Sequence, residues 1–201
     1  MRRTPLLPLA FVVLATACGD TRSSDGDPSR GAAGDDPQLV FWAELEELCG
    51  QAFEGAVTES VPPDPSFEGQ RLVMHVRGCD TGVIRVPFFV GEDRSRTWVI
   101  SSTSVGLRLK HDHRHEDGTE DAVTQYGGDT EGQGTRTAQT FPADRYTTEL
   151  VPTAATNVWS LEIEPGRSFA YALRREGSDR RFRVEFDLTR PADTPPAPWG
   201  G

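Results

Sequence analysis

Three of the four histidines in this chain stand at alternate positions of one short stretch. They are His111, His113 and His115, within "LRLKHDHRHEDG" at residues 107–118. Neutral imidazole binds zinc or copper, forms hydrogen bonds, and gains charge close to neutral pH. The pattern therefore leaves three interpretations open: a hydrogen-bonded polar end of a strand, the mouth of a ligand cavity, and a metal site.

The period of the stretch indicates which way the histidines face. In a strand every second side chain lies on the same face, so the histidines share a face with Leu107 and Leu109. The positions between them are all charged: Arg108, Lys110, Asp112, Arg114 and Glu116. Because charged side chains belong in solvent, we expect the histidines to continue an interior surface where it changes from apolar to polar.

The spacing limits the metal interpretation. At about 3.3 Å per residue, neighbouring same-face positions lie about 6.6 Å apart, and His111 and His115 about 13 Å apart. Two in-line histidines can share one ion, such as Zn²⁺, whereas three cannot. His111 and His113 would need a further ligand from elsewhere, either His75 or one of the acidic residues Asp117, Glu120 and Asp121.

Other catalytic patterns are scarce. The chain has no Gly-x-Ser-x-Gly elbow and no phosphate-binding glycine pattern before a helix. The acidic cluster "DGTED" lacks the alternating acids of a calcium loop. The glycine-rich residues 126–135 are typical of a loop. We assign no catalytic residue and expect a binding protein rather than an enzyme.

The N-terminus predicts export. In "MRRTPLLPLAFVVLATAC" two arginines precede a short apolar run, as in a signal peptide covering residues 1–17. The small residues before Cys18 resemble a bacterial lipobox, although Leu14 stands four places before the cysteine and not the usual three. The resemblance implies that Cys18 carries lipid such as palmitate. Because Gly19 is not the Asp of inner-membrane retention, it also implies anchoring in the outer membrane, facing the periplasm.

Export bears on the other two cysteines. Cys49 and Cys79 would meet an oxidising compartment, where pairing is favoured. We expect one disulfide, which would close a loop of about 30 residues and stabilise the fold by roughly 3–4 kcal/mol. Two buried free thiols are the alternative.

The charge of the chain restricts its partners. The formal net charge is −10 and becomes −12 once residues 1–17, with their two arginines, are removed. Such an acidic protein is not expected to bind nucleic acid. Membrane association should come from the lipid on Cys18 and not from a basic patch.

Composition divides the rest of the chain into three parts. Residues 18–36 hold small, polar and charged types and predict a flexible tether, and the Pro/Gly-rich residues 191–201 predict a disordered tail. Residues 37–190 are long enough for a single domain with one core. It should begin with a helix, with Pro37 at the first position and an end at Gly50 or Gly55. The helix would bury one apolar stripe: Phe41, Leu45, Leu48 and Ala52.

Period-two alternation dominates the remainder of this domain. Stretches such as "RFRVEFDLT", "WSLEIEP" and "SFAYALRR" alternate apolar with polar residues and are separated by turn sequences. We therefore predict a mainly β fold, in which one helix precedes an antiparallel meander of 8–10 strands. So many strands must close into a barrel or stack as a β-sandwich.

Two resemblances follow from these stretches. One helix and a run of up-and-down strands resemble the lipocalin-type (calycin) barrels, although the Gly-x-Trp signature of that group is absent. The stretches "RLVMHVRGCD", "DRSRTWVI", "LRLKHDHRHEDG" and "QYGGDT" resemble an uncharacterised family of proteobacterial lipoproteins, which implies no known chemistry. We accordingly expect a lipid-anchored envelope protein whose barrel binds a small or lipidic ligand or an envelope partner. The alternatives are a metal-dependent enzyme or metal-binding protein using His111 and His113, and a structural or interaction module.

Overall fold

The computed structural model describes residues 36–201. The predicted signal peptide, the lipid site at Cys18 and the predicted tether up to residue 35 lie outside the described residues. Among the residues that are described, no helix is long and apolar enough to cross a membrane.

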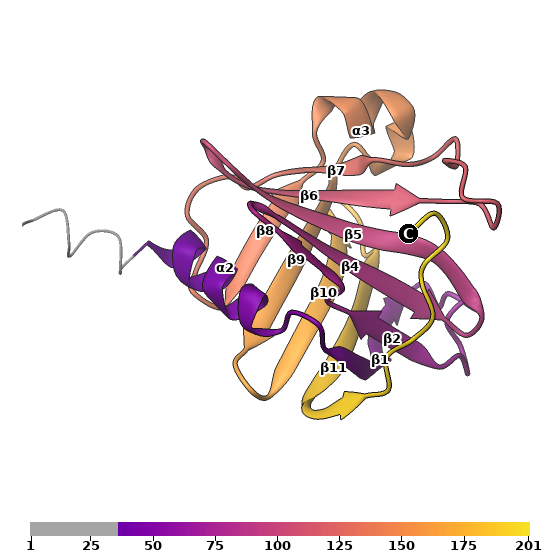
Figure 1. Ribbon diagram of the computed structural model, residues 1–201. Coiled ribbons are helices and arrows are strands. Elements are labelled where there is room, and N and C mark those ends of the chain that lie inside the picture. Colours follow the sequence, from indigo (N-terminus) through magenta and orange to yellow (C-terminus); the bar gives the residue numbers. More distant parts are fainter. Residues whose placement is uncertain (1–35) are drawn as a thin grey trace, which may run out of the picture.

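The described residues form one antiparallel sheet. Its strands pair in the order β7-β6-β5-β4-β2-β1-β11-β10-β9-β8, with β3 beside β4, and the two ends of the sheet, β7 and β8, come into contact (Figure 1). The prediction of a mainly β, barrel-like fold is confirmed, in place of the two-sheet sandwich. The strands are β1 (Ala52–Val61), β2 (Leu72–His75), β3 (Gly78–Asp80), β4 (Val83–Val90), β5 (Asp93–Thr103), β6 (Gly106–His113), β7 (Tyr126–Asp129), β8 (Ala138–Pro142), β9 (Asn157–Glu164), β10 (Ser168–Arg175) and β11 (Arg181–Ala192).

A helix closes one end of the barrel. Helix α2 (Pro37–Glu47) starts where the sequence predicts, because the Asp36 carboxylate accepts a hydrogen bond from the Gln38 backbone N–H at 2.9 Å. Phe41 and Leu45 are fully buried in the barrel core. The chain turns at Gly50, so Ala52 begins β1 and does not extend the helical stripe.

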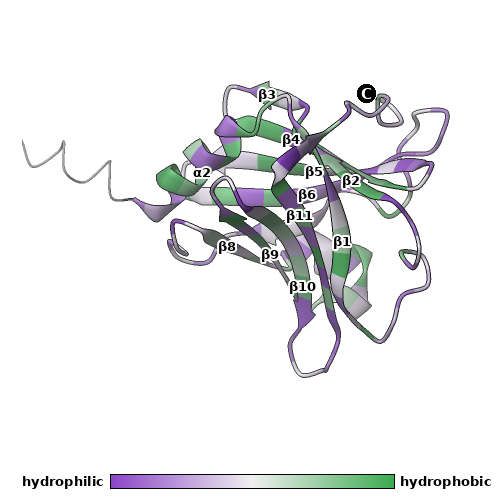
Figure 2. Cartoon of the chain, turned by 90° about the horizontal axis from the view of Figure 1, so that it is seen from below, coloured by the Kyte–Doolittle hydropathy of each residue, from purple (hydrophilic) through white to green (hydrophobic). Residues whose placement is uncertain are grey.

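Alternation along the strands builds the core, and Figure 2 shows hydrophobic and hydrophilic residues following one another along single strands. The inward row of β11 holds Val184, Phe186 and Leu188, as the sequence predicts. At the centre Trp98 stacks on Tyr171, with ring centroids 4.4 Å apart and planes 10° from parallel. Stacked rings of this kind add to the stabilisation from burial alone.

Glycine permits the sheet to close. A Cβ on Gly127 would lie 2.0 Å from the Leu109 carbonyl oxygen, and one on Gly128 would lie 1.7 Å from the Pro142 carbonyl oxygen. The Asp144 backbone N–H donates to the Gly127 carbonyl at 2.9 Å and joins the two ends of the sheet. Residues 126–129 are therefore a strand, whereas the sequence predicts a strand over "DAVTQYG" at 121–127 and a loop over 126–135. Residues 121–125 are not in a strand.

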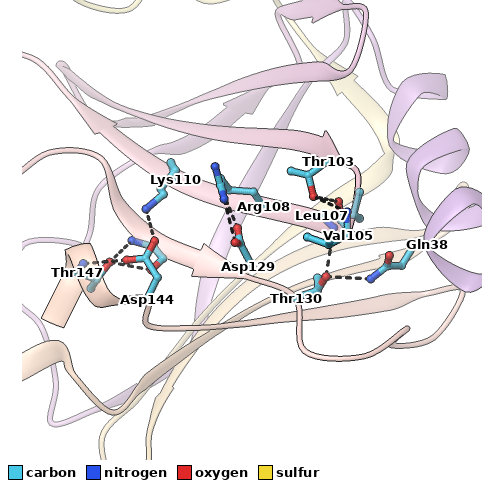
Figure 3. A network of polar contacts seen from close by, with 12 residues as sticks. Gln38, Thr103, Val105, Leu107, Arg108, Lys110, Asp129, Thr130, Asp144 and Thr147 are labelled. Carbon is cyan, nitrogen blue, oxygen red and sulfur yellow. Dashed lines mark hydrogen bonds and ion pairs between the residues drawn. The ribbon is translucent and has the colours of Figure 1, made fainter.

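Polar side chains form ion pairs and hydrogen bonds around the seam, the contact between the sheet ends β7 and β8 (Figure 3). Lys110 pairs with Asp144, and Arg108 pairs with Asp129, which confirms that the charged row of β6 lies on the outer face. Asp144 also caps the short helix α3 (Arg145–Leu150) by accepting from the Thr147 N–H at 2.8 Å. The contact between the two ends of the sheet is thus held by the Asp144 backbone hydrogen bond and the Lys110–Asp144 ion pair, and Arg108–Asp129 joins β6 to β7.

Two further links join distant parts of the chain. Cys49, just after α2, forms a disulfide with Cys79 in β3, with their Cα atoms 6.2 Å apart, which confirms the predicted pairing. The last residues lie against the barrel: the Trp199 N–H donates to the Arg94 carbonyl at 3.1 Å. Strand β11 also runs on to Ala192, past the predicted domain end at residue 190.

The seam leads to a prediction. Gly128 has no positive φ, so Gly128→Ala would introduce no backbone strain of its own, but its methyl group would overlap backbone at Pro142. We expect a loss of about 3 kcal/mol or more in the free energy of unfolding, the upper range for overpacking. Gly78→Ala is the matched control, because a Cβ there meets its nearest neighbour at an ordinary 3.4 Å. Urea unfolding of both variants measures the difference, and equal stabilities would contradict the proposed role of Gly128.

Candidate ligand-binding cavity

A cavity of about 430 Å³ lies inside the barrel at the end remote from α2. Strand β6 shows this polarity: Gly106 at its start lies beside Gln38 of α2, and His113 at its end lines the cavity. The wall combines aromatic rings with polar and charged side chains in comparable numbers. It is formed by Asp64, Phe67, Phe88, Arg96, Thr97, Trp98, His111, His113, Asp121, Val123, Tyr126, Val151, Thr153, Ala154, Asn157, Trp159, Tyr171, Leu173, Arg175, Arg180 and Phe182.

His111 crosses the barrel and forms part of the cavity floor. Its Nδ1 lies 3.0 Å from the Tyr126 carbonyl oxygen, and its Nε2 lies 2.8 Å from the Tyr171 hydroxyl on the opposite wall. Because a carbonyl only accepts, Nδ1 carries the proton, and in the neutral ring Nε2 accepts from the Tyr171 O–H. The ring also stacks on Tyr126, with centroids 4.5 Å apart.

Burial keeps this floor uncharged. Desolvation lowers the pKa of His111 to about 3, against a smaller opposing effect of the Tyr126 carbonyl. Burial likewise raises the pKa of Tyr171 well above its ordinary value and that of Tyr126 to about 12. At neutral pH the imidazole and the two phenols are neutral, because the low-dielectric interior disfavours the charged form of each.

His113 stands one step nearer the mouth. Its Nε2 lies 3.1 Å from the Tyr126 hydroxyl, and its side chain is half-buried. Burial lowers its pKa, and the positive charge of Arg96 acts in the same direction. His111 and His113 therefore share the interior face with Leu107 and Leu109, as the alternation predicts.

The other two histidines do not reach the cavity. Strand β6 ends at His113, and His115 is exposed in the following turn, where its backbone N–H donates to Thr119. His75 is buried on the outer face of β2, on the side of Val73 and Phe89. The metal set predicted from His111, His113 and His75 is thus not brought together. Within residues 36–201 no three histidine, cysteine or acidic side chains lie close enough to hold an ion.

The sequence pattern does not point to the three arginines of the wall. Arg96, Arg175 and Arg180 line the cavity, yet each stands in a charged stretch that looks solvent-facing when taken alone. Tyr171, in contrast, is signalled by the alternation of "SFAYALRR", which places it on the buried face with Phe169. The alternation of a strand predicts which face of the sheet a side chain lies on. It does not predict how far the residue lies from the end of the barrel, so residues at the mouth of the cavity are not identified from the sequence.

No family model, curated protein or solved structure matches this chain.

The state of His111 predicts a pH-dependent stability. Its folded pKa of about 3 lies below the ordinary value of 6.5, so the unfolded chain takes up the proton first as the pH falls. Stability is lost from about pH 6.5 down to about pH 3, by about 1.4 kcal/mol per pH unit. Between pH 7 and pH 5 wild type should therefore lose about 2 kcal/mol more than His111→Gln, whose side chain does not titrate.

Urea unfolding of both proteins at pH 7, 6 and 5 measures this difference. Protonation of carboxylates and of His113 affects wild type and variant alike and cancels in the comparison. Parallel stability curves would show that His111 is not held neutral in the folded protein.

Proposed function

We propose that the barrel binds a small, largely apolar molecule in the cavity. The observation that carries this proposal is the cavity itself. Its volume of about 430 Å³ falls within the range of small-molecule sites, about 300–1,000 Å³, and aromatic rings form much of its wall. A few polar groups converge on it, as they do in sites that orient a ligand.

The wall is organised before any ligand arrives. His111 joins β6 to β10 through Tyr171, and the Tyr126 hydroxyl holds His113. Phe67, from the connection between β1 and β2, packs against Phe182 with ring centroids 4.7 Å apart. A preformed site lowers the entropic cost of binding, which supports a binding role.

The same groups favour binding over proton-transfer catalysis. General acids and bases work best with pKa values near the operating pH. His111 has a pKa of about 3 and Tyr126 of about 12, so neither exchanges protons readily at neutral pH. Both ring nitrogens of His111 are also engaged within the protein, which leaves no lone pair for a metal.

We further propose that the protein is a lipoprotein of the outer membrane that faces the periplasm. The support comes from the signal-peptide pattern of residues 1–17 and the lipobox resemblance at Cys18. The Cys49–Cys79 disulfide is consistent with an oxidising compartment. In this proposal the lipid provides the membrane attachment and the barrel remains accessible to small molecules.

Cavity binding is tested with N-phenyl-1-naphthylamine, a neutral dye that fluoresces in apolar sites. Leu173 lines the cavity and is half-buried, so Leu173→Trp would fill part of the space. We expect its dye affinity to fall at least about tenfold, equivalent to about 1.4 kcal/mol. The matched control is Leu39→Trp on α2, where Leu39 is 51% exposed and outside the cavity. Absence of dye binding to wild type, or equal loss in both variants, would contradict cavity binding.

Lipid anchoring is tested separately by expressing the full chain with Cys18→Ala. Without the thiol no acyl chain can be attached, so we expect the variant to leave the membrane fraction and appear in the soluble periplasmic fraction. Fractionation with immunoblotting measures the distribution. Retention of the variant in the membrane fraction at the wild-type level would exclude Cys18 as the anchor.

A further inference from the structure

We infer that the bound molecule carries a carboxylate, which Arg175 and Arg180 recognise at the mouth of the cavity. The inference rests on the proposed binding function and names the class of ligand: an amphiphile with an apolar body and one acidic head group.

The three arginines of the wall are not equivalent. Arg96 is already neutralised, because its guanidinium pairs with Asp93 and lies over the ring of Phe67, 5.9 Å from the centroid. Arg175 and Arg180 form no ion pair with any carboxylate of the described chain. The arginines of the wall that have no ion-pair partner within residues 36–201 therefore lie on the hairpin that joins β10 to β11.

This hairpin holds the two arginines side by side. The Arg175 backbone N–H donates to the Arg180 carbonyl at 3.2 Å, so the residues face one another across the two strands. The Arg175 Nε–H donates to the Asn157 amide oxygen at 2.9 Å, which orients the guanidinium. Within residues 36–201, the Nε of Arg180 is buried and has no hydrogen-bond partner.

Within residues 36–201 the two guanidiniums thus have no carboxylate partner. An anion at the hairpin can accept from their Nη groups, and hydrogen bonds to charged donors contribute about 1.5–3 kcal/mol each. The fork of N–H groups on a guanidinium matches the two oxygens of a carboxylate. A planar carboxylate suits this site better than a compact cation or a neutral hydroxyl.

The residues just inside the arginines explain why the ligand should be amphiphilic. Leu173 precedes Arg175 by two positions and Phe182 follows Arg180 by two, so each arm of the hairpin carries an apolar residue deeper than its arginine. Leu173 and Phe182 are register partners and both line the cavity. The hairpin therefore presents an apolar pair followed outward by a cationic pair, complementary to a chain or ring system that ends in an acid.

Other charges in the cavity wall and on the whole chain further restrict the class of ligand. Asp64 and Asp121 also place carboxylates in the wall, and each accepts from a backbone N–H of its own loop, at Ser66 and Val123. Because these carboxylates repel an anion, the acidic head group is expected beside the hairpin arginines. The chain as a whole carries −10, which disfavours large polyanions. A single acidic group avoids most of that repulsion, because screening limits it to about 8–10 Å.

The test compares two displacers of N-phenyl-1-naphthylamine that differ only in the head group: decanoate and 1-decanol at pH 7.5. We expect Arg180→Gln and Arg175→Gln each to weaken decanoate binding about tenfold, as expected for loss of one charge-assisted hydrogen bond, and to change 1-decanol binding less than about twofold. Arg174→Gln is the matched control. It removes the same charge from the same hairpin, but Arg174 pairs with Glu176 and does not line the cavity.

The outcomes separate the two levels of the proposal. The carboxylate assignment is overturned if decanoate displaces the dye as well from both cavity variants as from wild type. It is also overturned if the affinities for decanoate and 1-decanol fall equally. Either result leaves cavity binding intact. A decanoate loss in Arg174→Gln as large as in Arg180→Gln shows a general charge effect and overturns it as well. Wild type that binds no dye overturns the proposed function itself.

Discussion

The close backbone approach at Gly127 and Gly128 is the constraint on which this barrel depends. A side chain at Gly128 would overlap the Pro142 carbonyl oxygen where the ends of the sheet meet, and one at Gly127 would overlap the Leu109 carbonyl oxygen within the β6–β7 pair. The pairing of β7 with β6 places Tyr126 beside His111 in the wall of the cavity. An open sheet would leave two unpaired edges and would expose the rings that now form the floor.

Within the closed barrel, the interior changes character along a single strand. The inward row of β6 runs from Leu107 and Leu109 in the core to His111 on the floor and His113 near the mouth. Helix α2 lies at the apolar end of the barrel (Figure 1), and the cavity lies at the polar end. The histidine pattern therefore marks the depth at which packing gives way to a cavity, and its third member, His115, falls beyond the strand.

Sequence periodicity predicts most of this arrangement, because one buried face and one wet face impose period two on long strands. It gives the barrel, the outward Arg108 and Lys110, and the inward His111. It gives β7 only in part: the strand predicted at "DAVTQYG", residues 121–127, overlaps β7 at its end, whereas "YGGD" has loop composition and becomes a strand through its pairing with β6. It also does not give Arg175 and Arg180, whose role depends on their place at the rim, a tertiary property that the local pattern does not carry.

The hydrogen bonds differ between the deep part of the cavity and its mouth. Along the wall, His111 bonds to Tyr171 and Tyr126 bonds to His113, so these four side chains hold the shape of the site. Their neutrality suits an apolar body, since a charged group there would have to overcome the same desolvation that lowers the pKa of His111. At the rim the balance is reversed, because Arg175 and Arg180 have no ion-pair partner within residues 36–201. Shape is therefore set by the satisfied interior, whereas discrimination between head groups falls to the few donors at the mouth.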